Sequence, residues 1–265
     1  MKEYRKPRSL EVVATAMCAA LYAAASYLTA YIPSPLGFGQ FRPAVVIPAF
    51  FAVVFGSMPA GLGAAIGTLI CDSIKHGGLY MGSLIAAVPG NFIGFYIFGA
   101  ICRRFSWRRF ILATFITLTL ANFIVAFLYI YVYKFLYLGA FEISFSNLMI
   151  LTLALTIWWF ATMLPFVLTI TPLLIRATAR VFPALVSESV RDSSLGREFP
   201  RLGFALLMII PGIIFLMLGL LTSFTWFGAF LTSINKLPSA DPIKVIFYGC
   251  GLGLMAIGAY ALTRR

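Results

Sequence analysis

Residues 37–56 read GFGQFRPAVVIPAFFAVVFG and place Gln40 and Arg42 at the head of an almost unbroken apolar run. A charge inside a bilayer is costly, and Pro48 removes a backbone donor from the middle of the run. A membrane segment with these features needs neighbours that supply polar partners. The remainder of the chain therefore decides what this run is.

The composition indicates an integral membrane protein. The chain has 265 residues, of which 62% are hydrophobic and 11% are charged, whereas a soluble domain carries about a quarter charged residues. Too few polar residues remain to cover a surface in water, so most of the surface must face lipid. We predict an all-α fold, a polytopic bundle of membrane helices.

The hydropathy pattern predicts about eight membrane crossings, six of them long apolar stretches. The run at 43–75 is split by FGSMPAG at 55–61 into two short helices. The predicted crossings are 11–31, 43–56, 59–75, 80–102, 110–133, 148–175, 202–222 and 243–263.

The positions of the basic residues predict the orientation. The net charge is +12, and 15 of the 20 Lys and Arg residues fall in four short runs that eight crossings place on one side. Such an excess is typical of cytoplasmic loops. We therefore expect a multi-pass protein of the plasma membrane with both termini cytoplasmic. Because no single face collects the charge, nucleic acid is not expected as a partner.

The segment 176–201 is the one long polar stretch and carries charges of both signs. It is interpreted as a cytoplasmic linker or surface helix. It separates a predicted six-helix membrane core, residues 1–175, from a predicted two-helix membrane appendage, residues 202–265.

Motifs for cofactors, metals and catalysis are not found in the sequence. The four cysteines are scattered, and the single histidine excludes an HExxH motif. No phosphate-binding GxxxxGK[ST] motif is present. We therefore expect no metal, no cofactor and no catalytic residues, and a protein that is not itself an ATPase or another enzyme.

Small residues mark a surface on the first helix. Ala16, Ala20 and Ala24 stand four residues apart and so lie on one helix face. Helices in lipid approach closely where their faces are small. Two interpretations stay open: packing inside the protein, or a docking surface for a partner.

Polar side chains at mid-membrane depth indicate a binding site. Asn91 and Asn122 are central in two neighbouring spans, and Trp158 and Trp159 are central in the next. Such residues usually face the protein interior. They are candidates to line a cavity for a small polar or aromatic molecule. The alternative is that the amides bond to each other and the tryptophans face lipid.

Further polar residues gather on the predicted outer side. Asp72 is expected to pair with Lys75 or Arg42 and so to hold a loop in place. Arg42, Lys75 and His76 would give a positive mouth that suits a carboxylate or phosphate group. Pro48 is expected to kink its short helix, and a broken span is tolerated where it borders a cavity.

The first 175 residues resemble the substrate-binding S components of energy-coupling factor (ECF) vitamin transporters. The resemblance is carried by the alanine stripe, by the short proline-containing run FRPAVVIPAFFAVVFG and by GSMPAGLGAAIGTLICD, a small-residue turn and glycine-rich helix that ends near an Asp. The family pattern has FGP-x-x-G at the turn, and FGSMPAG shifts the proline by two positions. The two extra C-terminal helices also depart from the usual six.

The resemblance implies a membrane subunit that binds a vitamin-like small molecule for uptake. Such a subunit would dock on a membrane coupling subunit, which two cytoplasmic ATPases drive. Ala16, Ala20 and Ala24 would then form the docking face, and Gln40 and Arg42 would belong to a gating loop over the substrate. Depth, rather than a motif, adds Asn91, Asn122 and Trp158 as substrate-binding candidates.

Two other functions are open from the sequence. A membrane enzyme acting on a lipid-linked substrate would use Asp72, His76 and Arg42 at the outer face. A structural membrane subunit without a ligand would use every polar group for packing only. A retained small molecule would favour the binding subunit over both.

Overall fold

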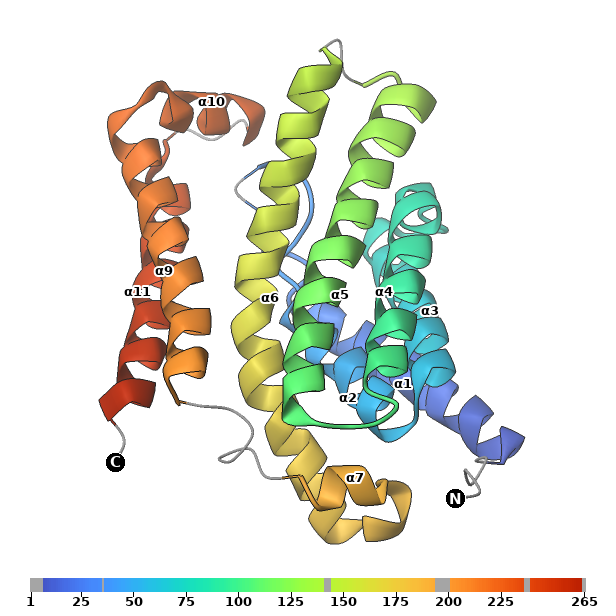
Figure 1. Cartoon of the computed structure of the whole chain (residues 1–265). Helices are drawn as coiled ribbons and strands as arrows, with labels where there is room; N and C mark the ends of the chain where they lie inside the picture. Colours follow the sequence, from blue (N-terminus) through green and yellow to red (C-terminus); the bar gives the residue numbers. More distant parts are fainter. Residues whose placement is uncertain (1–6, 35, 141–143, 194–200, 236–238, 264–265) are drawn as a thin grey trace. The chain divides into compact units, whose positions relative to one another are not determined.

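The computed structural model shows a helical protein (Figure 1). It describes residues 7–34, 36–140, 144–193, 201–235 and 239–263. Within these residues no β-strand is present, and a single isolated bridge joins Pro33 and Gln40. The predicted all-α membrane bundle is confirmed.

The helices follow the predicted spans closely. Those up to residue 193 are α1 (Arg8–Leu28), η1 (Pro43–Val45), α2 (Val46–Val54), α3 (Ser57–His76), η2 (Ser83–Ala87), α4 (Val88–Ile101), α5 (Trp107–Phe127), η3 (Leu128–Tyr137), α6 (Phe145–Val181), η4 (Pro183–Leu185) and α7 (Glu188–Arg191). Those beyond it are α9 (Arg201–Phe224), α10 (Trp226–Asn235) and α11 (Asp241–Thr263). In the described ranges, 7 helices are long and apolar enough to cross a membrane. The remaining predicted crossing, 43–56, is the shorter helix Pro43–Val54.

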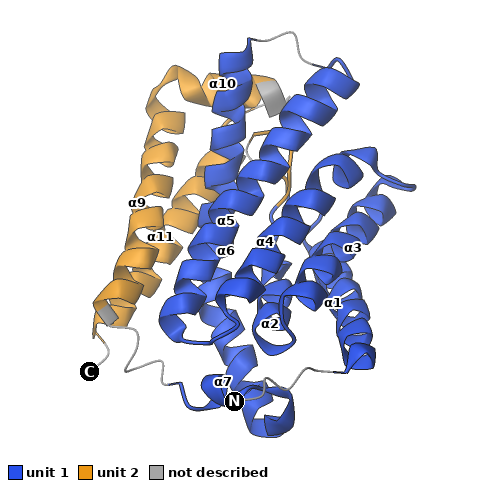
Figure 2. Ribbon diagram, turned by 45° about the vertical axis from the view of Figure 1, so that its right-hand side comes forward, with its two compact units in different colours: residues 1–32, 41–193 blue, residues 33–40, 194–265 orange. Residues whose placement is uncertain are grey.

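The chain divides into two compact units (Figure 2). Unit 1 holds residues 1–32 and 41–193, and unit 2 holds residues 33–40 and 194–265. Helix α6 continues to Val181, so the first arginines of the predicted linker 176–201 extend a membrane helix. The predicted domain boundaries at 175 and 202 stay a prediction.

In unit 1 the long helices pack in chain order, α1 on α3, α3 on α4, α4 on α5 and α5 on α6. Glycines let them approach closely. A Cβ added to Gly63 would lie 2.5 Å from Cys18 Cβ, and one added to Gly67 would lie 2.7 Å from the Ala19 carbonyl oxygen. The glycine-rich sequence of α3 is therefore explained by its contact with α1.

Helix α2 is short and lies among α1, α3, α4 and α6, all of which it contacts. With η1 it comprises 3 and 9 residues, a rise of about 20 Å, whereas the hydrocarbon core is about 30 Å thick. The chain before Pro43 must therefore cover the remaining depth without a helix. We call this end of unit 1, where residues 29–32 and 41–42 lie at the C-terminal half of α3, the loop end.

Of the two prolines of this segment, Pro43 lies where the sequence indicated and Pro48 does not. Pro43 begins η1, which fits a helix start because its missing N–H has no helical partner there. Pro48 was expected to kink the helix in its middle, but it is the third residue of α2. Because the α-helix begins only at Val46, the proline falls in the first turn, where backbone N–H groups lack helical partners.

Unit 2 contains a tightly packed pair of helices, α9 and α11. A Cβ on Gly212 would lie 3.0 Å from the Gly251 carbonyl oxygen, and one on Gly258 would lie 2.9 Å from that of Ala205. The short helix α10, between the two, was not expected from the sequence. The two predicted spans of the appendage are both helices.

Candidate functional site

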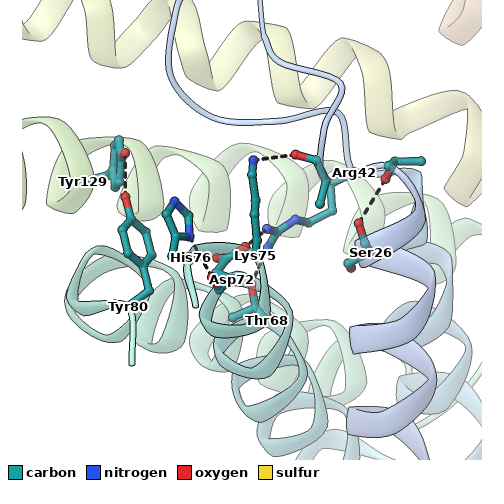
Figure 3. Close-up of polar contacts among 10 residues, drawn as sticks. Ser26, Arg42, Thr68, Asp72, Lys75, His76, Tyr80 and Tyr129 are labelled. Atoms are coloured by element: carbon teal, nitrogen blue, oxygen red, sulfur yellow. Dashed lines mark hydrogen bonds and ion pairs between the residues drawn. The ribbon is translucent and has the colours of Figure 1, made fainter. Parts of the chain in front are cut away.

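A buried ion pair joins the loop end to α3 (Figure 3). Arg42 Nη2 lies 2.6 Å from Asp72 Oδ1, and the two residues are 9% and 8% exposed. Arg42 Nη1 donates a hydrogen bond to Thr68 Oγ1. The expectation that Asp72 pairs with Arg42 or Lys75 is confirmed for Arg42. The two charges compensate each other in an apolar surrounding, which is what a buried charge requires.

Arg42 lies deeper in the bundle than the sequence predicted. Thr68 precedes His76, the last residue of α3, by eight residues, which is about 12 Å along the helix. A residue at the outer surface, where the sequence placed Arg42, would contact the last turn of α3 instead. Because η1 and α2 are short, they begin inside the bundle and not at its surface. Arg42 directly precedes them and therefore also lies inside the protein.

Lys75 and His76 contact backbone oxygens near the ion pair. Lys75 Nζ donates to the Ala30 carbonyl oxygen at 2.5 Å, and His76 Nδ1 lies 2.7 Å from the Asp72 carbonyl oxygen. With Asp72 paired to Arg42, this region holds both signs of charge. The positive mouth expected for an anionic ligand is therefore partly neutralised.

Two hydroxyl groups in this region were not singled out from the sequence. Tyr22 and Ser26 of α1 are fully buried, and the Ser26 hydroxyl has no hydrogen-bond partner within the described ranges. Tyr22 interacts electrostatically with Arg42 and Asp72. Tyr22 and Ser26 are four residues apart, which places both side chains on one face of α1. This spacing is the feature of the sequence from which the two hydroxyls could have been found.

Asn91 and Asn122 lie at the same level on α4 and α5. A Cβ built on Gly90, the residue before Asn91, would meet Val125, and one built on Gly94 would meet Ala121, the residue before Asn122. The two asparagines are 9% and 7% exposed. Both amides therefore lie beside the α4–α5 contact, inside the bundle.

The amides have few partners of their own. Asn122 Nδ2 reaches Met163 Sδ on α6 at 3.7 Å, and a thioether is a weak acceptor. Asn91 makes no side-chain hydrogen bond among the residues that the structure describes. The alternative that the two asparagines bond to each other is therefore not observed among the described residues.

Trp158 and Trp159 of α6 are 4% and 9% exposed, so neither faces lipid. Helical spacing places Trp159 one turn from Met163 and on its face, whereas Trp158 is turned about 140° away from Met163. Since Met163 contacts Asn122, Trp159 is the better placed of the two to share a site with that amide. The sequence alone did not distinguish them.

Aromatic rings cover the loop end beyond these amides. His76 stacks on Tyr80 with ring centroids 3.8 Å apart, and the hydroxyls of Tyr80 and Tyr129 are 3.0 Å apart (Figure 3). Tyr80 also meets Tyr133 edge to face. Tyr129 and Tyr133 belong to η3, which contacts η2. Both segments are π-helical, and π-helical turns are frequent at functional sites.

The remaining predicted residues lie on the outside of α1 and in the loop. Ala16, Ala20 and Ala24 are exposed, whereas Ala19 and Ala23 are buried. Ala19 and Ala23 therefore pack inside the protein. The stripe of Ala16, Ala20 and Ala24 is exposed, and its role as a docking surface stays a prediction. Gln40 is 7% exposed and forms the isolated bridge with Pro33.

A comparison with models of protein families gave a match that covers more than half of the chain. Residues 8–180, from the start of α1 to the end of α6, match the family model described as "ECF-type riboflavin transporter, S component". Comparisons with curated proteins and with solved structures gave no match. The match includes every candidate residue described above and excludes α9 to α11. This integral membrane protein belongs to the S components of ECF-type riboflavin transporters, the substrate-binding membrane subunits of an uptake system.

Proposed function

We propose that this chain binds riboflavin, or a flavin with the same ring system, within the loop end of its six-helix core. The observation that carries the proposal is the family match over residues 8–180, whose description names riboflavin. The buried amides with few partners support it, because a buried polar group without a partner is costly. A ligand that completes their hydrogen bonds would remove that cost.

The chemistry of a flavin fits these side chains. One edge of its fused rings is a cyclic imide with two carbonyl acceptors and an N–H donor between them. Asn91 and Asn122 each offer an acceptor and two donors, and so can pair with such an edge. Trp159, or Trp158 as the sequence suggested, would stack on the flat face. Gln40 and Arg42, at the two sides of Phe41, would belong to the loop that closes over the ligand.

The binding proposal is tested with the purified full-length protein in detergent. Riboflavin fluorescence is expected to be quenched on titration, with saturation at one riboflavin per chain. Thiamine, which lacks a flat imide-bearing ring system, should not compete. A folded, helical protein that leaves riboflavin fluorescence unchanged would contradict the proposal.

We further propose that bound ligand crosses the membrane only with a separate energy module. The exposed face of Ala16, Ala20 and Ala24 would dock on a membrane coupling subunit, and cytoplasmic ATPases would drive the cycle. In this arrangement both termini are cytoplasmic and the loop end faces outward, as the basic runs indicate. Uptake of labelled riboflavin into cells is expected to require coexpression of the module, whereas binding is not.

A further inference from the structure

Exposed arginines gather at the end of unit 1 where the loop between α4 and α5 and the end of α6 both lie (Figure 1). Arg176 directly follows the apolar stretch of α6, and Arg180 stands one turn beyond it on the same face. The loop and the first turn of α5 add Arg104 and Arg109. We call these four exposed residues, Arg104, Arg109, Arg176 and Arg180, the arginine cluster.

Trp107, the first residue of α5, joins the two parts of the cluster. The guanidinium of Arg176 lies over the Trp107 ring, 5.7 Å from its centroid, and such a cation is attracted by the face of an indole. The ring is 1% exposed and meets Phe105 edge to face, with centroids 5.0 Å apart. The end of α6 is therefore held beside the loop, and one ligand can reach arginines from both.

The loop is ordered by its own hydrogen bonds. Ser106 Oγ accepts from Arg109 N at 3.2 Å, and Arg109 Nη1 donates to the Arg104 carbonyl oxygen at 3.0 Å. That bond uses one of the five N–H donors of the guanidinium. A ligand therefore meets a surface that is already arranged, which lowers the cost of binding.

The positive charge of the cluster is not compensated by neighbouring acids. No Asp or Glu occurs at 73–141 or at 143–187. Among the residues that the structure describes, none of the four arginines forms an ion pair, whereas Glu188 of α7 lies 3.9 Å from Arg191. The cluster thus differs from the loop end, where Asp72 neutralises Arg42.

The length of α6 places the cluster at the membrane surface. The helix has 37 residues, about 55 Å, whereas the hydrocarbon core is about 30 Å thick. Since its apolar stretch ends at Ile175, Arg176 lies where the helix leaves the hydrocarbon. Trp107 is at the same level, and tryptophan is enriched at this boundary. The anionic groups in this plane are the phosphates of the lipids, and the planar guanidinium fork matches phosphate oxygens.

We propose that the arginine cluster binds the headgroup of an anionic phospholipid, with its phosphate between Arg176 and the arginines of the α4–α5 loop. The observations favour a lipid over an acidic protein, because the cluster lies in the plane of the headgroups. This site is separate from the amides proposed for the flavin and does not depend on them. A lipid bound there bridges α5 and α6 at one membrane surface.

The test uses the full-length chain in an uncharged detergent and native mass spectrometry, with phosphatidylglycerol or phosphatidylcholine added. Phosphatidylglycerol is expected to bind more tightly, with a preference that falls as salt is raised. Equal binding of the two lipids overturns the proposal. Inorganic phosphate, added at the same concentration as the lipid, should not displace it. Displacement would identify a site for free phosphate and overturn the lipid as its occupant.

Single substitutions locate the lipid on the cluster. Arg176→Gln and Arg109→Gln are each expected to lower the affinity for phosphatidylglycerol about fivefold, the effect of one basic residue near an anionic surface. Arg180→Gln, which leaves the Trp107 contact intact, supplies a further variant in case Arg176→Gln does not fold, and circular dichroism checks folding.

Arg191→Gln is the matched control. It removes the same charge from the same unit, but Arg191 is exposed and lies beside Glu188. Its affinity for phosphatidylglycerol should change by less than about twofold, because the local charge there is already compensated. An equal loss in Arg191→Gln and in the cluster variants would show a general attraction by net charge and overturn the site.

Discussion

Arg42 illustrates how a charged residue is accommodated in an apolar chain. Its cost is met by Asp72, 2.6 Å away, and by Thr68. Removing one member of a buried pair leaves the other charge uncompensated, at a cost of about 3–5 kcal/mol. The Arg42 side chain is thus held by two residues of α3.

At the same scale, Asn122 is expected to contribute directly to ligand affinity. Asn122→Ala removes a buried amide that Met163 satisfies weakly, so the folded protein should lose little stability. Riboflavin affinity should fall by about tenfold or more, the equivalent of one or two buried hydrogen bonds. The fluorescence titration described above measures it.

Thr114→Val provides the matched control for Asn122→Ala. Thr114 is a buried polar residue of the same helix, and its hydroxyl donates to the Phe110 carbonyl oxygen at 2.9 Å. Its replacement should leave riboflavin affinity unchanged. Equal losses of affinity in both variants would indicate a general disturbance of α5 and remove the support for Asn122 as a ligand contact.

Helix α3 is built around close approach to its neighbours. Gly63→Ala would place a methyl group within 2.5 Å of Cys18 Cβ, so α1 must shift, at a cost of roughly 1–3 kcal/mol. The same change at Gly253 of α11 meets open space and should stabilise its helix by up to about 1 kcal/mol. Thermal unfolding in detergent is therefore expected at a lower temperature for Gly63→Ala and at an equal or higher one for Gly253→Ala.

Helix α1 has a buried face and an exposed face with different expected roles. Ala20→Leu adds bulk to the exposed stripe, so riboflavin binding by the purified protein should be unchanged. Uptake into cells that express the energy module should be lost, because a small face is needed for close helix contact. Ala100→Leu, the same substitution at an exposed site of α4, is the control. Loss of binding in folded Ala20→Leu would contradict the docking role.

At the scale of the whole molecule, the family match and the C-terminal helices concern different parts of the chain. The match ends at residue 180, and α9 to α11 belong to unit 2. A chain that ends at residue 193 is therefore expected to bind riboflavin as the full chain does. The same titration measures this, with circular dichroism as the check on folding. Loss of affinity in folded truncated protein would show that binding needs the residues after 193.

The sequence determined the class of the protein and the order of its helices. Apolar stretches long enough to span a bilayer, and the basic runs between them, are local properties that lipid and backbone hydrogen bonding convert directly into helices. The pairing of Asp72 was also foreseeable, because a carboxylate inside a span must find a cation and few were available. The alanine stripe on α1 could be placed on one face from its spacing alone.

Tertiary structure decided which polar groups meet and how deep they lie. The spacing of α1 could not tell that Ala16, Ala20 and Ala24 are exposed while Ala19 and Ala23 pack inside. Nor could the sequence place Arg42 beside Thr68, or Met163 beside Asn122. Each depends on how far a neighbouring helix extends and how closely it approaches. Those distances are fixed by the short α2 and the glycines of α3 and α4, through contacts between residues far apart in the chain.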